Sequence, residues 1–265
     1  MTTGTPIAEE LLEIASRAAA GAGALLMERF EGPAEGVTTK STPTDVVSDA
    51  DRDSQELIVS LLHRERPGDG IISEEGAAGN SETGLTWVID PLDGTVDFLY
   101  GIPQWCVSVA VADQTGRLAG VIYDPPRAEL FAAMRGKGAY RNDEPITVSP
   151  QQDLSQALVA TGFSYDSRIR RAQAEVVLRL LPEVRDIRRA GSAALDLAWC
   201  ACGRVDAFFE ADMHVWDRAA GELLITEAGG VISPLLPPLG DGRGVVAANQ
   251  GLHDALRALV IGDSL

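Results

Sequence analysis

The sequence predicts one continuous α/β unit. Three observations lead to this class: predicted helices alternate with short strands, no long Gly/Ser/Pro-rich linker divides the chain, and no internal repeat is present. The chain has 265 residues, 45% of them hydrophobic, which is enough for a sizeable core and argues against intrinsic disorder. We therefore expect residues 1–265 to form a single domain.

The first third of the chain predicts two helices and two strands. Apolar residues at helical spacing predict a helix over 7–30, and Gly and Pro residues predict a loop over 31–44. A second helix is expected from Ser48 or Asp49 to Arg66, because Pro67-Gly68 stops it. Short runs of β-branched and aromatic residues predict strands at 71–73 and 86–89, and both are followed directly by carboxylates.

The remainder of the chain continues this alternation. The stretch from Trp105 to Val148 is rich in strands, expected at 105–112, 117–123, 129–133 and 139–141. Farther along, strands are expected at 158–161, 184–188 and 205–210. Helices are expected at 167–181, 192–202, 216–228 and 252–261, the third of them ended by Gly229-Gly230.

The charge balance limits the class of partner. With 22 Lys+Arg against 39 Asp+Glu, the formal net charge is −17. Nucleic-acid backbones and anionic membranes attract basic surfaces, so neither is expected as the main partner. An anionic substrate would need a bound cation to draw it in.

Cysteine usage and hydropathy bear on the cellular compartment. Cys106, Cys200 and Cys202 are an odd count without a framework of spacings, so we expect a reduced, cytoplasmic setting. Cys200 and Cys202 lie on an apolar segment and are expected to pack in the core. No basic region followed by an apolar run begins the chain, and no apolar stretch reaches about 18 residues, so neither a secretory signal nor a transmembrane helix is expected.

The densest chemical signal is Trp87-Val88-Ile89-Asp90-Pro91-Leu92-Asp93-Gly94-Thr95. A strand carries Asp90 to its carboxyl end, Pro91 fixes a turn, and Asp93 can curl back beside Asp90. Two carboxylates so close repel each other and would protonate unless a cation compensates them. Mg²⁺ prefers such oxygen ligands, and the backbone of Gly94-Thr95 suits a phosphate. A plain turn would use the same residue types.

Two further acidic elements suit the same site. Glu74-Glu75 follows the predicted strand at 71–73, although a solvated loop would explain it equally well. Asp217 follows Trp216 inside an apolar stretch at a helix start, where an N-terminal helix cap is the alternative.

Other catalytic patterns are not satisfied. Asp49-Ala50-Asp51-Arg52-Asp53 resembles the start of a calcium loop, but Ser54 and Ser60 replace the required Gly and Glu. No Gly-x-Ser-x-Gly elbow, P-loop or Rossmann glycine signature is present. The histidines are isolated, so a Ser-His or Cys-His pair is not expected, and His214 is expected to be a site wall or a surface residue.

Together these residues resemble the inositol monophosphatase family of Mg²⁺-dependent, lithium-sensitive sugar phosphatases. The resemblance runs from about Lys40 to Gly230. Its landmarks, in order, are Lys40, Asp45-Val46-Val47-Ser48-Asp49-Ala50-Asp51, Ser73-Glu74-Glu75, Asp90-Pro91-Leu92-Asp93-Gly94-Thr95, Gly191-Ser192-Ala193-Ala194 and Trp216-Asp217-Arg218-Ala219-Ala220-Gly221. It implies a layered αβαβα sandwich, usually assembled as a homodimer.

The resemblance also implies a set of metal ligands. Glu74, Asp90 and the Leu92 carbonyl would hold the first Mg²⁺. Asp90, Asp93 and Asp217 would hold the second, and Glu74 would help with a weaker third. Two to three ions per site are thus implied, with Mn²⁺ as a possible substitute.

Catalytic and substrate contacts follow from the same resemblance. Asp51 and Thr95 would orient and deprotonate the attacking water on the first metal, which Glu74 helps to hold. The phosphate would be gripped by the backbone at Gly94 and Thr95, beside Asp93. The alcohol portion of the substrate would contact Gly191, Ser192, Ala193 and Glu210. The metal and phosphate contacts thus fall within about residues 1–150, and most substrate contacts within about 151–265.

Two positions depart from the pattern of the family. Asp97 stands where members with inositol phosphate activity commonly have Asn, and Val96 fits neither the 3′-phosphoadenosine nor the histidinol-phosphate phosphatases. Asp97 affects either substrate choice or only a local turn.

The expected activity is hydrolysis of a small polyol or sugar phosphate, with inositol 1-phosphate as the first candidate. Fructose 1,6-bisphosphate, histidinol phosphate and 3′-phosphoadenosine 5′-phosphate are the alternatives. A regulatory protein that keeps the fold and acts through partner contacts is the alternative outside enzymes. The complete ligand set favours retained catalysis.

Overall fold

The computed structural model describes residues 5–30, 32, 35–40, 46–76, 78–79, 81–235 and 242–262. Asp45, one of the landmarks of the resemblance, and part of the loop predicted over 31–44 lie outside the described residues.

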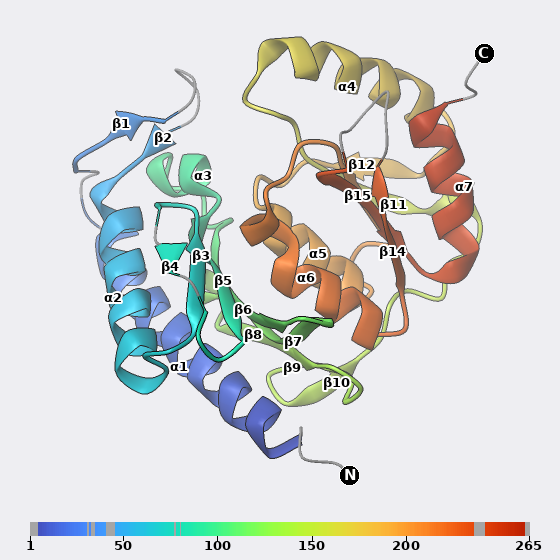
Figure 1. Ribbon diagram of the computed structural model, residues 1–265. Coiled ribbons are helices and arrows are strands. Elements are labelled where there is room, and N and C mark those ends of the chain that lie inside the picture. The colour runs from blue at the N-terminus through green and yellow to red at the C-terminus, as the bar shows by residue number, and fades with distance from the viewer. Residues whose placement is uncertain are drawn as a thin grey trace.

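Five layers of alternating helices and sheets make up the molecule (Figure 1). Helices α1 and α2 cover one face of an eight-stranded sheet, and α5 and α6 fill the space between this sheet and a five-stranded sheet. Helices α4 and α7 cover the outer face of the smaller sheet. The layered αβαβα sandwich expected from the sequence is thus confirmed.

Apart from α3, which the sequence did not predict, the helices begin and end close to their predicted limits. They are α1 (Thr5–Phe30), α2 (Asp49–Glu65), α3 (Thr95–Leu99), α4 (Ser167–Leu180), α5 (Ala193–Ala201), α6 (Val215–Glu227) and α7 (Gln250–Ile261). Side chains of the preceding residues accept backbone hydrogen bonds at the starts of several of them: Ser48 and Asp51 form a capping box on α2, and Asp166, Ser192 and Asn249 cap α4, α5 and α7.

The eight-stranded sheet is antiparallel except for one pair. In spatial order it contains β10 (Glu144–Ile146), β9 (Ala139–Arg141), β8 (Glu129–Met134), β7 (Gly116–Asp124), β6 (Cys106–Asp113), β5 (Thr86–Asp93), β3 (Gly70–Ser73) and β4 (Ala78–Gly79). Strands β3 and β5 are the parallel pair. This exception matters for the site, because parallel strands end at the same edge of a sheet.

The smaller sheet is mixed. Its spatial order is β12 (Asp186–Arg188), β11 (Leu158–Thr161), β13 (Ala207–Glu210), β15 (Gly244–Ala248) and β14 (Val231–Leu235). A separate hairpin pairs β1 (Thr38–Thr39) with β2 (Val46–Val47).

Three buried clusters match the three helical layers, because alternate residues of each strand face opposite sides. On β6, Val107, Val109 and Val111 pack under α1 and α2, whereas Cys106 and Ala110 face the central layer. On β13, Phe208 faces the central layer and Phe209 the outer one. The free cysteines Cys200 and Cys202 belong to or pack against the central cluster, as predicted.

Several elements differ from the prediction. Strand β1 lies inside the predicted loop, and β5 continues four residues farther to Asp93. The elements that were not individually expected are α3, β2, β4, β10, β14 and β15. Pro234 argues against a strand, so β14 was not predicted. The proline is tolerated there because β14 is an edge strand. Strand β15 is a short, fully buried run whose pattern has no distinctive period.

Candidate active site

The parallel pairing of β3 and β5 brings two acidic residues to one sheet edge. Ser73 lies opposite Ile89, and the Glu74 backbone N–H donates to the Ile89 carbonyl at 3.3 Å. The next residue on each strand is therefore an acid, Glu74 on one and Asp90 on the other. The register of the parallel pair therefore brings Glu74 close to Asp90, which the sequence alone only suggested.

A bulge in β5 places Asp90 and Asp93 together. Asp90 pairs with Ser108 and Asp93 with Cys106, so the two aspartates are three residues apart on β5 but their partners only two apart on β6. Residues three apart on a regular strand point to opposite faces, and one extra residue reverses this. The bulge therefore lets both carboxylates reach the same side of the sheet.

Gly94 turns the chain directly after Asp93. Its φ is +95°, a conformation that favours glycine, and an added Cβ would lie 2.6 Å from the Gln104 carbonyl oxygen. The turn starts the short helix α3 and buries Thr95 at its first position.

Thr95 is held by Asp51 from α2. The Thr95 hydroxyl lies 2.9 Å from Asp51 Oδ1 and 3.0 Å from the Leu92 carbonyl oxygen. Asp51 is fully buried, and its Oδ2 accepts hydrogen bonds from the Ser48 backbone N–H and hydroxyl at 2.8 and 2.6 Å. The carboxylate is therefore fixed on one side, and its other oxygen is aimed at Thr95.

Asp93 links the large sheet to the central helices. Its Oδ2 accepts hydrogen bonds from the Ser192 hydroxyl at 2.6 Å and from the Ala194 backbone N–H at 2.7 Å. Gly191 precedes them at φ +118°, where an added Cβ would lie 1.8 Å from Asp97 Oδ2. Hydrogen bonds thus connect Ser192 and Ala194, in the segment expected to contact the substrate, to Asp93, which is expected to bind metal.

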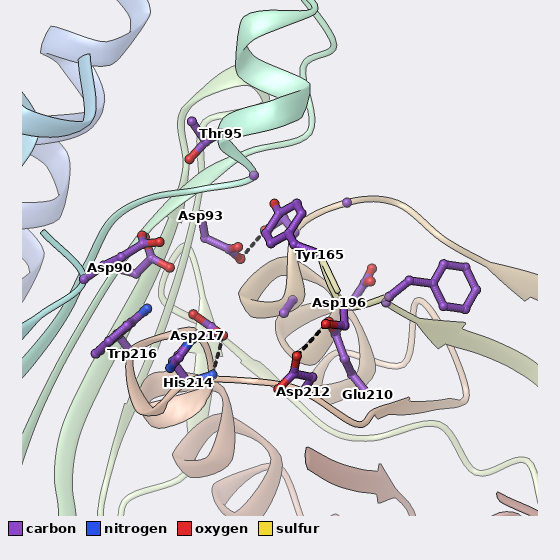
Figure 2. Close-up of a pocket in the computed structure, with 18 of the residues that line it drawn as sticks. Asp90, Asp93, Thr95, Tyr165, Asp196, Glu210, Asp212, His214, Trp216 and Asp217 are labelled. Atoms are coloured by element: carbon purple, nitrogen blue, oxygen red, sulfur yellow. Dashed lines mark hydrogen bonds between the residues drawn. The ribbon is translucent and has the colours of Figure 1, made fainter. Parts of the chain in front are cut away.

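Asp217 stands in the first turn of α6 and accepts a 2.7 Å hydrogen bond from the His214 backbone N–H. Both interpretations of this residue therefore apply: it caps the helix and it also lines the cavity. Figure 2 shows Asp90, Asp93 and Asp217 bordering one open space between β5 and the start of α6.

These residues enclose a cavity of about 580 Å³. Of the residues expected in the site, all but Asp51 line it; these are Glu74, Asp90, Leu92, Asp93, Gly94, Thr95, Gly191, Ser192, Ala193, Glu210 and Asp217. Asp51 lies behind Thr95 and reaches the cavity through the threonine hydroxyl.

Six buried carboxyl groups that line the cavity have pKa values above their ordinary range; they are Glu74, Asp90, Asp93, Asp196, Glu210 and Asp217. Burial, and then the neighbouring charges of Glu74, Asp93 and Asp217, raise the pKa of Asp90. Burial raises the pKa of Glu74 to about 7 against the opposing effect of Lys40. Burial and Asp93 raise the pKa of Glu210 to about 8. The negative charge gathered here thus lacks sufficient compensation from the protein.

Lys40 provides part of that compensation. Its ammonium nitrogen lies 2.8 Å from Glu74 Oε1 and also forms an ion pair with the Glu75 carboxylate. Burial by itself would lower the pKa of Lys40, but the two glutamates outweigh it and raise the pKa.

The donor set fits a hard divalent cation by its chemistry. Carboxylate and carbonyl oxygens are the ligands of Mg²⁺, and a cation would relieve the repulsion that raises these pKa values. In the side-chain positions shown, no three Asp, Glu, His or Cys residues of the described chain are close enough to form a metal cluster. Asp93 and Asp217 instead accept the protein hydrogen bonds given above. Closing around an ion therefore requires their side chains to turn into the cavity.

Three residues on the side of the cavity that contains Glu210 were not predicted from the sequence. Arg189, Asp196 and Asp212 line the cavity beside Glu210, and Figure 2 shows Asp196 and Asp212 next to it. Asp196 is 1% exposed although it lies on the apolar helix α5, and an acid inside an apolar run was the available signal. His214 is exposed and also lines the cavity, with its ring centroid 4.7 Å from that of Trp216, so it fits both alternatives expected for it.

Asp97 is buried next to Gly191, which lines the cavity. It is 8% exposed, packs against Gly191, and one carboxylate oxygen, Oδ2, has no hydrogen-bond partner in the described part of the chain. Burial raises its pKa, and Arg189 opposes the rise.

Comparison with known proteins identifies the family of the chain. A model of the inositol monophosphatase family matches residues 7–262. The chain belongs to the inositol monophosphatase family. A protein named inositol-1-monophosphatase from Mycobacterium leprae is 43% identical over 235 residues, covering 84% of this chain and 80% of its own. A protein named Nus factor SuhB from Xylella fastidiosa is 40% identical over 259 residues, covering 94% of each chain.

A solved structure shows the same fold. The crystal structure of extragenic suppressor protein suhB from Bartonella henselae matches with a TM-score of 0.90 and 34% identity, covering 97% of this chain and all of that one. Membership of the inositol monophosphatase family supports a phosphatase that acts on a phosphorylated substrate, and the family is generally Mg²⁺-dependent. Among the described residues, no helix has the length and apolar character needed to cross a bilayer.

Proposed function

We propose that this protein is a Mg²⁺-dependent phosphomonoesterase that hydrolyses a small polyol or sugar phosphate, with inositol 1-phosphate as the first candidate. The observation that carries the proposal is the enclosure of Glu74, Asp90, Asp93 and Asp217 around one cavity, beside a buried Asp51–Thr95 hydrogen bond. The relative named inositol-1-monophosphatase, 43% identical, supports the choice of substrate.

Two ion positions would share Asp90. Glu74, Asp90 and the Leu92 carbonyl would hold one Mg²⁺, and Asp90, Asp93 and Asp217 would hold the other. Bound Mg²⁺ supplies positive charge that offsets the charge of the phosphate and of the departing alcohol. The protein's task is then to position the reactants and to move one proton.

Asp51 and Thr95 would move that proton. The attacking water would give a proton to Thr95 Oγ1 while the threonine hydroxyl passes its own to Asp51 Oδ1, 2.9 Å away. The two hydrogen bonds from Ser48 keep Asp51 in place for this transfer. The backbone at Gly94 and Thr95, beside Asp93, would grip the phosphate oxygens.

The alcohol portion of the substrate would lie against the other half of the chain. Gly191, Ser192, Ala193 and Glu210 line that side of the cavity. The N-terminal part, to about residue 150, would then supply most metal and phosphate contacts, and the C-terminal part the specificity. Hydroxyl groups of a polyol suit this wall, because it presents carboxyl, hydroxyl and backbone groups.

A phosphate-release panel tests the proposal. With Mg²⁺ present, we expect the highest kcat/KM for inositol 1-phosphate among four esters, the others being fructose 1,6-bisphosphate, histidinol phosphate and 3′-phosphoadenosine 5′-phosphate. A different order would reassign the substrate, and release from none would reject the phosphatase. Inhibition by millimolar Li⁺ and a dimeric mass in sedimentation are expected from the same proposal.

A second candidate is a regulatory role through partner contacts. The relative named Nus factor SuhB, 40% identical over 94% of both chains, favours it. A protein with that role alone would release phosphate from none of the four esters, so the same panel separates the candidates.

A further inference from the structure

A second cavity, of about 450 Å³, lies along α6, and the described residues that line it all differ from those of the candidate active site. Helix α6 lies between β7 and β8 of the large sheet and β14 of the smaller sheet (Figure 1). The lining combines three arginines, Arg117, Arg135 and Arg218, with apolar residues. Sites for small molecules commonly have volumes of about 300 to 1,000 Å³, so this cavity is large enough for one.

The three arginines differ in how well the protein pairs them. Arg135 is fully engaged, because it donates to the Arg117 carbonyl oxygen and, at 3.0 and 3.1 Å, to the two carboxylate oxygens of Asp113. Arg117 and Arg218 instead share the single carboxylate of Glu222. An outer nitrogen of Arg117 lies 3.4 Å from Glu222 Oε2, and Arg218 donates to Oε1. Two guanidinium groups therefore depend on one acid.

Both of these guanidinium groups retain donors without acceptors. The Nε atoms of Arg117 and Arg218 are buried and have no hydrogen-bond partner among the described residues. The two arginine side chains are 24% and 21% exposed, so water can satisfy their remaining donors only in part. Glu227 also lines the cavity, but its carboxylate already accepts hydrogen bonds from three backbone N–H groups in the turn after β8. The cavity thus has spare positive charge, although the whole chain carries −17.

The lining indicates an anion that carries an apolar group. The planar fork of a guanidinium matches the oxygens of a phosphate through parallel N–H donors, and two neighbouring guanidinium groups match its double charge. The rest of such a molecule would contact apolar surface of the same cavity, which is formed by Leu223, Ile232, Pro234 and Val245.

We propose that this cavity is a second binding site, which takes a small phosphate monoester with an apolar substituent on Arg117 and Arg218. Glu222 would compete with the ligand, because it uses the same two guanidinium groups. The site is separate from the candidate active site, and its occupation does not depend on the proposed phosphatase activity.

Calorimetric titration of the full-length protein with phenylphosphonate in EDTA tests the inference. This probe is not an ester, and without metal ions the carboxylates of the catalytic cavity repel it. We expect one bound molecule per chain, held about fivefold more tightly than inorganic phosphate because of the phenyl group. Arg117→Gln and Arg218→Gln should each weaken binding about tenfold or more, the usual effect of losing a charged hydrogen-bond donor.

Glu222→Gln gives an effect of the opposite sign. It removes the competing charge while keeping the shape of the side chain, so phenylphosphonate should bind about tenfold more tightly. A purely structural role for this cluster gives no such gain. Arg64→Gln, on a side chain 68% exposed, removes an arginine elsewhere and should leave binding unchanged. Thermal melting establishes that each variant is folded, and Arg117→Lys, which loses the planar fork, replaces Arg117→Gln if the latter does not fold.

The contrary outcomes are distinct. The inference is overturned if the wild type binds no phenylphosphonate, if folded Arg117 and Arg218 variants bind it unchanged, or if Glu222→Gln fails to tighten binding. Arg189 lines the catalytic cavity, so loss of binding in Arg189→Gln alone would place the anion there and would also overturn the inference. None of these results bears on the phosphatase, which is tested by phosphate release with Mg²⁺.

Discussion

Asp90 lies at the point where the two proposed ion positions meet. It is 2% exposed, and Glu74, Asp93 and Asp217 all raise its pKa after burial itself. We expect Asp90→Asn to lower Mg²⁺-dependent phosphate release by more than ~100-fold, since even outer partners of metal ligands cost up to about that factor. Steady-state phosphate release measures the effect.

The same variant should remain folded without metal. Asn has nearly the shape of Asp and removes a buried charge from a crowded acidic group, so in EDTA the free energy of unfolding should be unchanged or higher. Asp254→Asn, on a side chain 80% exposed, is the control and should leave the rate unaltered. Near wild-type turnover in Asp90→Asn would remove Asp90 from the reaction.

Thr95 is expected to affect the rate more than binding. Thr95→Ala removes the hydroxyl that lies 2.9 Å from Asp51, and kcat should fall by ~10²- to 10⁴-fold, the usual effect of losing a proton-transfer group. KM should change little, because the contact orients water and not substrate. Thr95→Ser keeps the hydroxyl and should recover most of kcat. Equal losses in kcat for both variants would contradict this role.

At the level of single residues, the sequence was informative where chemistry depends on residue type. The carboxylates at Glu74, Asp90, Asp93 and Asp217 could be singled out because acids that follow strands or interrupt apolar runs are unusual. The ion pairs of Lys40 could not be foreseen in the same way. They depend on side-chain geometry between residues 34 apart, and no local pattern encodes that geometry.

The turn between β5 and α3 is the element whose backbone is most constrained by the site. Gly94→Ala would combine φ +95° with an added Cβ only 2.6 Å from the Gln104 carbonyl oxygen. We expect the free energy of unfolding to fall by ~2 to 5 kcal/mol, the sum of left-handed strain and overpacking. Urea denaturation followed by circular dichroism measures it.

Gly84→Ala isolates the conformational part of that effect. Its φ is +83°, and the nearest atom to an added Cβ is 4.0 Å away, so only strain should remain, at ~1 to 2 kcal/mol. If both variants lose the same stability, the close approach of Gln104 is not important.

Among the elements, long periodic segments were predictable and short pairings were not. Helix α1 extends over 26 residues with a continuous apolar face. A periodic pattern of this length identifies a helix even where its first and last residues are ambiguous. Strands β14 and β15 are five residues each, and their identity depends on pairing with each other and with β13. The bulge in β5 likewise becomes visible only when β6 is aligned beside it.

On the scale of the whole molecule, the buried acids should make stability depend on pH. The pKa is raised from 4.5 to about 7 for Glu74 and to about 8 for Glu210, so the folded chain retains protons that the unfolded chain has already released. Stability therefore falls as pH rises from about 4.5 to about 8. In EDTA, the urea midpoint should be lower at pH 8.5 than at pH 5.5.

Mg²⁺ should reverse much of this loss. The ion binds ionised carboxylates of the folded state, so it should raise the urea midpoint more at pH 8.5 than at pH 5.5. The acids whose pKa is lowered, such as Asp166 at about 2, titrate below this range and do not alter the sign. A midpoint in EDTA that is constant over this range would show that the cavity acids are not protonated at pH 5.5.

The Asp93–Ser192 hydrogen bond has a practical consequence. It joins strand β5 of the large sheet to the start of the central helix α5, so turnover can report whether these two elements remain packed together. Mild denaturants that loosen this contact should abolish turnover while the circular dichroism spectrum still looks native.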